Sequence, residues 1–247
     1  MPGGDKIRSL NPLPDKNHMN DQEIYMMASS FDKARFNMVE QQIRPWEVLD
    51  PRVLELMETL PREQFVPESY RDLAYADIEV PIGQGQQMMF PRIEAKLLQA
   101  LAIRPTDKVL EVGTGSGYLT ACLANLAKQV VSIDLHDEFS QQVEQKLEQQ
   151  EIRNVTLKSG DALAAPLEEG PFDAIAVTGS LPTSQQAEIF RQQLKIGGRL
   201  FVVIGTRPVM ECMLITRHAD KIFEEESILE TELAPLINAP APVEFEF

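Results

Sequence analysis

A glycine-rich turn at residues 113–117 constrains most strongly what this chain can fold into. It follows an apolar run that ends in Glu111 and Val112, and a helical pattern begins at Tyr118. The glycines of the turn allow positive φ angles and a close approach of the backbone to a bound ligand. The pattern therefore predicts a buried strand that enters a tight turn and opens a helix, as at the start of a Rossmann-like fold.

The carboxylate of Glu111, just before the turn, indicates which ligand would bind there. A pyrophosphate would be repelled by this negative charge, whereas a ligand that carries an ammonium and a sulfonium would be attracted. S-adenosyl-L-methionine carries both groups. The turn therefore favours this cofactor, with S-adenosyl-L-homocysteine as its product, over a dinucleotide or a purely structural turn.

Acidic loops follow the next two predicted strands. The strand at residues 129–133 ends at Asp134, whose carboxylate is placed to accept hydrogen bonds from a ribose diol. That position would suit a nicotinamide dinucleotide equally well. The strand at residues 155–158 leads to Asp161, which can accept the adenine amino group, and to Ala162, which leaves room for the ring. In isolation Asp161 would more often be a turn residue or a helix N-cap, but three such loops in succession favour a nucleoside site.

Strand and helix patterns alternate over residues 106–236, with later strands expected at 172–177, 199–204, 211–216 and 222–229. This alternation predicts an α/β, Rossmann-like methyltransferase fold whose mostly parallel twisted sheet has helices on both faces. Residues 31–105 instead predict an N-terminal helical and acceptor-loop region, with helices at 31–43, 52–60 and 92–102. We expect residues 1–30 to be a flexible leader, in which residues 21–28 can form a short helical turn, and residues 31–236 to be one compact domain. Residues 237–247 form a C-terminal tail that we expect to be loose from residue 239.

Composition indicates a soluble globular enzyme. The chain has 247 residues, of which 43% are hydrophobic, enough for one sizeable core. Its formal net charge of −15 argues against nucleic acid and against anionic membranes as partners. We see no membrane-spanning stretch, signal peptide, disulfide framework or metal-ligand cluster, and we predict a cytoplasmic location. The oligomeric state is left open.

Residues 38–236 resemble the protein-L-isoaspartate (D-aspartate) O-methyltransferases, repair enzymes that methylate the α-carboxylate of isoaspartyl residues in damaged proteins. Two strings are specific: Leu-Pro-Arg-Glu-Gln-Phe-Val-Pro at 60–67 and Leu-Glu-Val-Gly-Thr-Gly-Ser-Gly-Tyr at 110–118. Shorter similar segments lie at 38–43, 74–77, 81–86, 193–199 and 234–236. The resemblance implies cofactor contacts from Glu111, Gly113, Gly115, Asp134, Asp161 and Ala162. We complete the predicted cofactor set with Gln86, Met88, Thr114, Gly117, Leu135 and Thr178.

The predicted acceptor loop departs from the family pattern. The family reads Gly-Gln-Thr-Ile-Ser, and its Ser is regarded as the hydroxyl of the catalytic site. Here residues 85–91 read Gly-Gln-Gln-Met-Met-Phe-Pro, which puts Gln87 in place of Thr and Met89 at the Ser position. A thioether cannot donate a hydrogen bond to a carboxylate. The smaller changes at Ala162 and at residues 179–180 exchange one small residue for another and are expected to leave the cofactor site intact.

A carboxylate acceptor is already ionised near pH 7 and needs no general base, so the lack of an evident base favours it. It would need a local cation, for which Arg44, Arg62, Arg71 and Arg92 are candidates. Arg92 directly follows the altered loop and is the best of them, although it could equally be an exposed residue of a first helical turn.

Met88 and Met89 could cap an apolar acceptor pocket or simply pack beneath the leader. Three functions follow: methylation of isoaspartyl protein, methylation of a small molecule or another protein group, and cofactor binding without catalysis.

Overall fold

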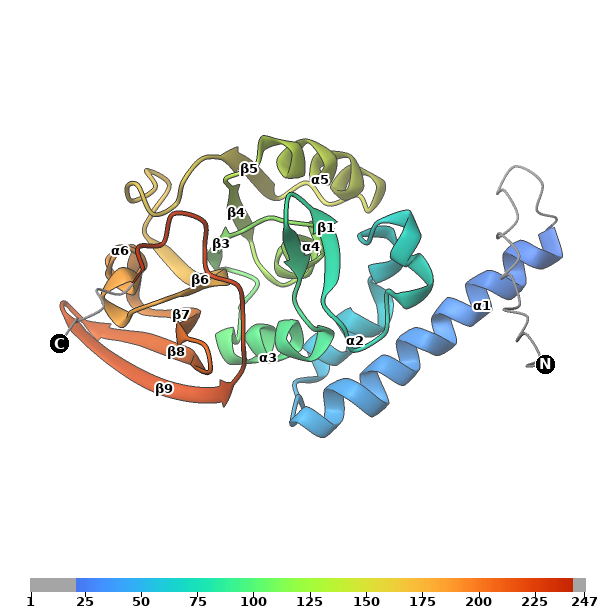
Figure 1. The fold of residues 1–247 in the computed structure, drawn as a ribbon, viewed down its shortest axis with the longest axis horizontal. Coiled ribbons are helices and arrows are strands. Elements are labelled where there is room, and N and C mark those ends of the chain that lie inside the picture. The colour runs from blue at the N-terminus through green and yellow to red at the C-terminus, as the bar shows by residue number, and fades with distance from the viewer. Residues whose placement is uncertain (1–20, 242–247) are drawn as a thin grey trace, which may run out of the picture.

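The computed structural model describes residues 21–241, with side chains from residue 30 onwards. Its centre is a seven-stranded sheet in the order β5-β4-β3-β6-β7-β8-β9 (Figure 1). The strands are β3 (Lys108–Val112), β4 (Gln129–Asp134), β5 (Val155–Ser159), β6 (Phe172–Leu181), β7 (Leu194–Thr206), β8 (Val209–Ala219) and β9 (Ile222–Glu230). Along the order β5-β4-β3-β6-β7 each pair of neighbouring strands is parallel, whereas β8 pairs antiparallel with β7 and with β9. The predicted α/β fold is confirmed.

Helices account for most of the rest of the described chain. They are α1 (Asp21–Met38), α2 (Pro51–Thr59), α3 (Pro91–Leu101), α4 (Tyr118–Leu126), α5 (Asp137–Gln149) and α6 (Glu188–Arg191), with a π-helical turn at Val39–Ile43 and 3-10 turns at Arg44–Trp46, Arg62–Gln64, Glu68–Leu73 and Ser184–Ala187. The Asp50 carboxylate accepts a hydrogen bond from the Arg52 backbone N–H at 2.9 Å, which is the N-cap that starts α2.

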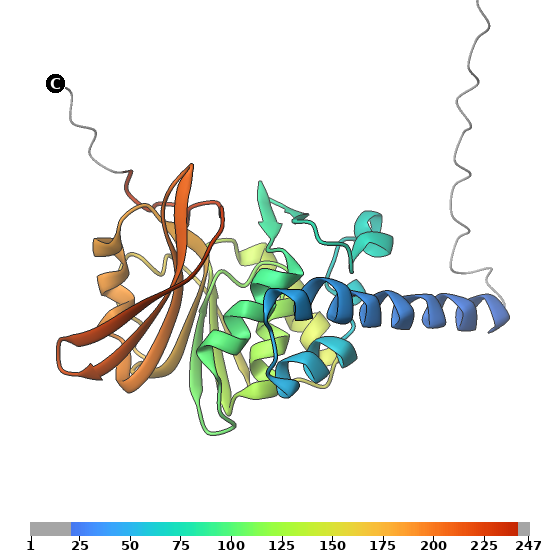
Figure 2. The same ribbon diagram turned by 90° about the horizontal axis from the view of Figure 1, so that it is seen from below.

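Helix α1 joins two segments that the sequence pattern separated. The prediction had a short helical turn at residues 21–28 and a helix from residue 31, whereas α1 is one helix from Asp21 to Met38 and takes in the last part of the predicted leader. The remainder of that leader, residues 1–20, lies outside the described residues. The amino-terminal half of α1 projects from the body of the protein (Figure 2).

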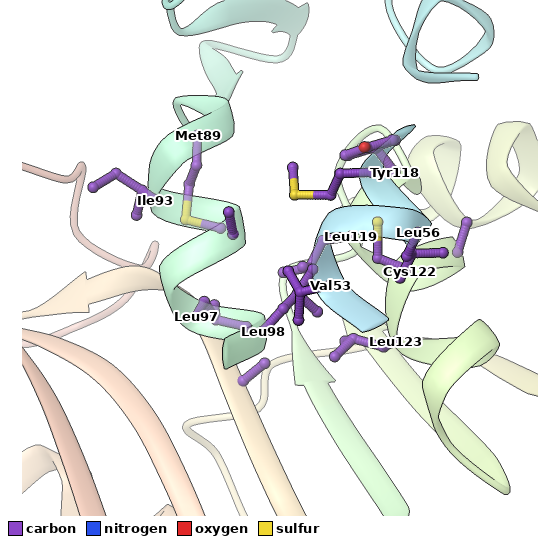
Figure 3. Packing of buried hydrophobic residues seen from close by; sticks show 14 of the residues in the cluster. Val53, Leu56, Met89, Ile93, Leu97, Leu98, Tyr118, Leu119, Cys122 and Leu123 are labelled. Atoms are coloured by element: carbon purple, nitrogen blue, oxygen red, sulfur yellow. The ribbon is translucent and has the colours of Figure 1, made fainter. Parts of the chain in front are cut away.

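The two faces of the sheet carry separate hydrophobic clusters. Consecutive residues of one strand point to opposite faces, so Val109 joins the cluster under α3, α4 and α5, while Leu110 joins the cluster on the side of α6. Figure 3 shows the first cluster, in which α2, α3 and α4 interlock through Leu56, Leu97 and Cys122. The sheet is therefore covered on both sides, which leaves its strand ends as the place for a site.

A small hairpin, β1 (Val80–Gly83) with β2 (Gln86–Met88), was not predicted as strands. Its strands are too short to show a periodic hydrophobic pattern. The turn is recognisable only from its backbone, because Gly83, Gln84 and Gly85 all have positive φ. The hairpin directs residues of the predicted acceptor loop towards the carboxyl edge of the sheet.

Candidate functional site

A cavity of about 320 Å³ lies at the carboxyl ends of the parallel strands. In open α/β sheets this edge is where ligands bind. Of the predicted cofactor residues, eight line the cavity: Gln86, Gly113, Gly115, Asp134, Leu135, Asp161, Ala162 and Thr178. The other four, Met88, Glu111, Thr114 and Gly117, lie behind this wall and are not part of its surface.

The turn after β3 admits only glycine at two of its positions. Gly113 has φ +96°, and a Cβ added there would lie 2.1 Å from Oγ1 of Thr178. The Thr178 hydroxyl is fixed in that place because it lies within donating distance of the Val112 and Gly113 carbonyls, at 2.9 and 3.0 Å. Gly117 has φ +84°, and its Cβ would meet Val143 of α5 at 2.6 Å. The turn after β3 and Thr178 of β6 thus come close enough to shape one wall of the cavity.

Asp134 at the end of β4 is oriented by the backbone. One carboxylate oxygen accepts from the Gly115 N–H and the other from the His136 N–H, both at 2.9 Å. Two carboxylate oxygens offer about four acceptor positions. The carboxylate therefore retains capacity for the hydroxyls of a ribose.

Asp161 after β5 is held in a similar way. Its oxygens accept from the Leu163 N–H at 2.8 Å and from the Asn238 side chain at 3.0 Å. Asn238 and Ile237 belong to the predicted C-terminal tail, just before the stretch from residue 239 that was predicted to be loose, and Ile237 lines the cavity. Residues 237–240 contact the body of the protein, because Ala239 packs against the core and the Pro240 carbonyl accepts a hydrogen bond from Gln186. Residues 242–247 lie outside the described residues.

Glu111 lies fully buried beneath the glycine turn. One carboxyl oxygen accepts from the hydroxyls of Thr120 at 2.5 Å and Ser132 at 2.6 Å, while the other oxygen, also buried, has no hydrogen-bond partner. Burial raises the pKa of Glu111 to about 8. An unpaired, buried carboxyl oxygen fits a neighbouring cationic ligand, since a cation would stabilise the ionised form.

We expect the substitution Glu111→Gln to flatten the pH dependence of stability. Because the folded pKa exceeds the ordinary value of 4.5, the folded chain keeps a proton that the unfolded chain has released, so stability falls as the pH rises from about 4.5 to about 8. The native chain should lose on the order of 4 kcal/mol more than the variant between pH 5 and pH 9. Urea unfolding without cofactor measures this difference.

The control for this prediction is Glu144→Gln, which changes an exposed carboxyl on α5. Its unfolding free energy should follow the native pH profile. Parallel profiles for the native chain and Glu111→Gln would show instead that the Glu111 pKa is ordinary.

Met88 and Met89 do not line the cavity at the strand ends. Both side chains are buried in the core, and Met89 packs beside Ile93 of α3 (Figure 3). The Met89 carbonyl accepts a hydrogen bond from Arg62 at 3.1 Å, and Arg62 forms a fully buried ion pair with Glu94. A separate and much smaller hollow is lined by Met89, Phe90, Ile93, Glu79 and residues 231–233.

The four arginines proposed to hold an acceptor anion are paired with carboxylates. Arg44 pairs with Glu40, Arg62 with Glu94, and Arg71 with Glu68. None of these arginines lines the cavity at the strand ends.

Arg92, the preferred candidate, is engaged as well. It pairs with Asp77, and its guanidinium lies over the rings of Phe90 at 4.1 Å and Trp46 at 4.8 Å. Its side chain is 17% exposed, so it is neither a free cation nor a solvent-exposed residue of the first helical turn. Arg92 does not line the cavity at the strand ends either.

Several residues that line the cavity were not predicted. They are Glu79, Ile82, Val112, Ile133, Phe139, Gly160, Leu163, Gly179, Arg207 and residues 233–237. Gly85 and Gln87 belong to the quoted acceptor loop, and His136, which follows Leu135, fits either a place beside the adenosine or a helix start; all three line the cavity. Arg207 follows a strand that the sequence pattern predicted to be parallel. The loop after such a strand lies at the ligand edge, so a signal for Arg207 was available.

The described residues contain neither a membrane-spanning helix nor a metal-ligand cluster. Among residues 21–241, no helix is long and apolar enough to cross a membrane. In the same part of the chain, no group of three or more His, Cys, Asp and Glu side chains could hold a metal ion.

Comparisons with known proteins agree with this geometry. A family model described as protein-L-isoaspartate(D-aspartate) O-methyltransferase matches residues 33–240. A protein-L-isoaspartate O-methyltransferase of Syntrophus aciditrophicus is 43% identical over 198 residues, which cover 80% of this chain and 90% of that protein. Protein-L-isoaspartate O-methyltransferase 2 of Marinobacter nauticus is 41% identical over 201 residues, 81% of this chain and 91% of that protein.

A solved structure from Plasmodium falciparum, in complex with S-adenosyl-L-homocysteine, has a TM-score of 0.70 to this chain at 21% sequence identity. It covers 83% of this chain, and 97% of its own length is matched. At this identity the likeness shows the shared fold.

Proposed function

From the membership of this chain in the protein-L-isoaspartate (D-aspartate) O-methyltransferase family, we infer that it methylates the α-carboxylate of isoaspartyl residues in proteins. It is an S-adenosylmethionine-dependent methyltransferase. One observation supports the acceptor assignment most directly. A single cavity joins the loops after β3, β4 and β5 to the β1–β2 hairpin, so one wall can hold a nucleoside and the other an acceptor.

When bound, S-adenosylmethionine supplies a methyl group on a sulfonium. A carboxylate attacks without a general base, so the task of the protein is to position both groups and to exclude water. We propose that Asp134 holds the ribose, that Asp161 and Ala162 hold the adenine, and that Glu111 favours the positive charge. The cavity lining supports the first two roles, and the unpaired oxygen of Glu111 supports the third.

The β1–β2 hairpin is placed to cover the reacting groups. Ile82 lies so close to the glycine turn that a Cβ on Gly115 would be 3.1 Å from its Cδ1. Gln84 at the hairpin tip donates to Glu138 of α5 at 2.5 Å. The hairpin therefore reaches from the glycine turn after β3 to α5, and it contributes Gln86 and Gln87 to the cavity.

We expect the chain to transfer a radiolabelled methyl group to an isoaspartyl peptide and not to its aspartyl twin. The label should be released by mild base, because a carboxyl ester is base-labile. Calorimetry with S-adenosyl-L-homocysteine provides the control for an intact cofactor site. Good cofactor affinity with no labelled isoaspartyl peptide would contradict the acceptor assignment and favour another protein group or a small molecule.

The altered acceptor loop is the reason to keep that alternative. Gln87 lines the cavity in place of the family Thr, and the position of the family Ser carries a buried methionine. The wall, which lies entirely within the described residues, includes Gln86 and Gln87 but neither Met88 nor Met89. The methionines therefore give no support to a closed, non-catalytic acceptor site. A catalytic-site role for Met89 or Arg92 and a cofactor contact of Met88 stay predictions.

We also retain a cytoplasmic location and a protein partner as proposals. Both cysteines, Cys122 and Cys212, are buried free thiols, which suits a reducing compartment. The absence of a nucleic-acid partner rests on the net charge alone.

A further inference from the structure

Arg207 is the one lysine or arginine among the described residues that line the cavity at the strand ends. The carboxyl groups of the same lining are Glu79, Asp134 and Asp161. A carboxylate that enters this cavity is repelled by these three groups and attracted by the guanidinium of Arg207.

The fold fixes Arg207 at the acceptor end of the cavity. It lies in the turn between β7 and β8, where Thr206 is the register partner of Val209. The turn is tight, since Gly205 has φ +123° and a Cβ there would lie 2.4 Å from the Val209 carbonyl. Because β7 is parallel to β6, this turn lies at the same edge as the cofactor loops.

The order of the strands separates Arg207 from the nucleoside end. Along the edge β5-β4-β3-β6-β7, the predicted adenine residue follows β5, the ribose residue follows β4, and the glycine turn follows β3. Arg207 follows β7, beyond the glycine turn and on the side away from the nucleoside. A methyl acceptor must lie beyond the sulfonium, so the ends of β6 and β7 are the places for it, and Arg207 follows the second of these.

The present partner of Arg207 can be exchanged. Its Nε lies 3.0 Å from a carboxylate oxygen of Glu232, and the two side chains are 73% and 53% exposed. Exposed ion pairs of this kind contribute little stability. Glu79 also lies near Arg207, which partly offsets the effect of burial in raising the Glu79 pKa. An incoming carboxylate can therefore replace Glu232 and form the two parallel hydrogen bonds that a guanidinium offers.

We propose that Arg207 binds the α-carboxylate of the isoaspartyl acceptor and selects it over neutral groups; this rests on the proposed function. During transfer the bond from the methyl carbon to sulfur breaks as a bond to the carboxylate oxygen forms, and the electron pair stays on sulfur. The acceptor becomes a neutral ester and the cofactor a thioether. The ester no longer attracts Arg207, so Glu232 can return and the product leaves.

The test compares an isoaspartyl peptide with an analogue whose α-carboxylate is a carboxamide. Binding of each labelled peptide is measured by fluorescence anisotropy in the presence of S-adenosyl-L-homocysteine. The native chain should prefer the carboxylate, and Arg207→Gln should reduce that preference by about tenfold or more. In methyl transfer, KM for the isoaspartyl peptide should rise by a similar factor while kcat stays within about threefold, since the lost contact is made before the transition state.

Three further variants sharpen the test. Arg207→Lys keeps the charge but loses the paired geometry, and should retain part of the preference. Arg153→Gln removes an equal charge at an exposed position in the α5–β5 connection and should keep the full preference. Glu232→Gln removes the competing carboxylate and should lower KM by about two- to threefold.

The outcomes distinguish this inference from the proposed function. If the native chain methylates isoaspartyl peptide and Arg207→Gln keeps the full carboxylate preference, the role of Arg207 is wrong and the repair activity stands. If Arg207→Gln weakens S-adenosyl-L-homocysteine binding by the same factor as peptide binding, Arg207 serves the cofactor carboxylate and the inference is again overturned. If the native chain methylates no isoaspartyl peptide at all, the proposed function fails first.

Discussion

Replacing Arg62 by methionine is expected to lower the free energy of unfolding by about 3–5 kcal/mol, because it leaves Glu94 buried without its cation. Arg62 has no exposed surface and pairs with Glu94, which is 3% exposed. Its guanidinium also lies 4.6 Å from the centre of the Tyr118 ring, at the start of α4. Urea unfolding of the native and variant chains measures the loss.

Two comparisons separate the ion pair from general effects of losing an arginine. Arg44→Met removes an exposed pair with Glu40 and should change stability by less than about 1 kcal/mol. The double variant Arg62→Met with Glu94→Leu should recover most of the stability, since a matched apolar pair avoids the desolvation of both charges. Equal losses for Arg62→Met and Arg44→Met would contradict the prediction.

The double variant also tests how the ion pair supports the site. Arg62 donates to the carbonyl of Met89, so the acceptor loop loses a backbone anchor even when the core is repacked. An unsatisfied buried carbonyl costs about 1–3 kcal/mol. We expect the double variant to fold and to bind S-adenosyl-L-homocysteine, but with a raised KM for the isoaspartyl peptide. The buried string at residues 60–67 thus connects the core to the loop that faces the acceptor.

The cofactor half of the site could be predicted from sequence because its residues lie at strand ends. Strand ends follow from hydrophobic runs that stop at a polar or glycine residue, and β4 ends at Asp134 as expected. Parallel pairing then brings such ends to one edge without further information. Asp134, Asp161 and Gly113 line one cavity for this reason.

The acceptor half could not be predicted in the same way, because ion pairing between distant segments decides which arginine is available. Arg92 looked free in the sequence but pairs with Asp77 and lies between two aromatic rings. Arg207 was overlooked, although its turn follows a parallel strand. The inward direction of Met89 depends on the β1–β2 hairpin, whose short strands have no periodic signal.

The predicted bounds of some helices and strands were wrong for a related reason. Helix α1 is continuous from Asp21, although the sequence pattern suggested only a short helical turn at residues 21–28 within the leader. Hydrophobic periodicity locates the buried part of a helix, whereas a segment that projects from the body has little reason to show it. Strand β7 is likewise longer than the apolar run at residues 199–204, since its first residue, Leu194, already pairs with Phe172 of β6.

A substitution in the glycine turn is expected to have a large effect on cofactor affinity. Gly113→Ala should weaken S-adenosyl-L-homocysteine binding by about ten- to a hundredfold, because the added methyl would overlap the Thr178 hydroxyl and force the turn or β6 to move. Thr178 is itself a cavity residue, so any such shift alters the wall. Isothermal titration calorimetry on the variant measures the change in affinity.

The substitution Gly197→Ala serves as a control for the effect of backbone strain alone on cofactor affinity. Gly197 has φ +80°, close to the +96° of Gly113, but a Cβ there would meet nothing within 4 Å. It lies near the start of β7, at the end of the sheet away from the cavity. Gly197→Ala should therefore lose about 1–2 kcal/mol of stability and keep native affinity for the cofactor product. If both variants bind it equally well, the close approach of Gly113 to Thr178 does not define the cofactor wall, and the site would have to be sought at another strand end.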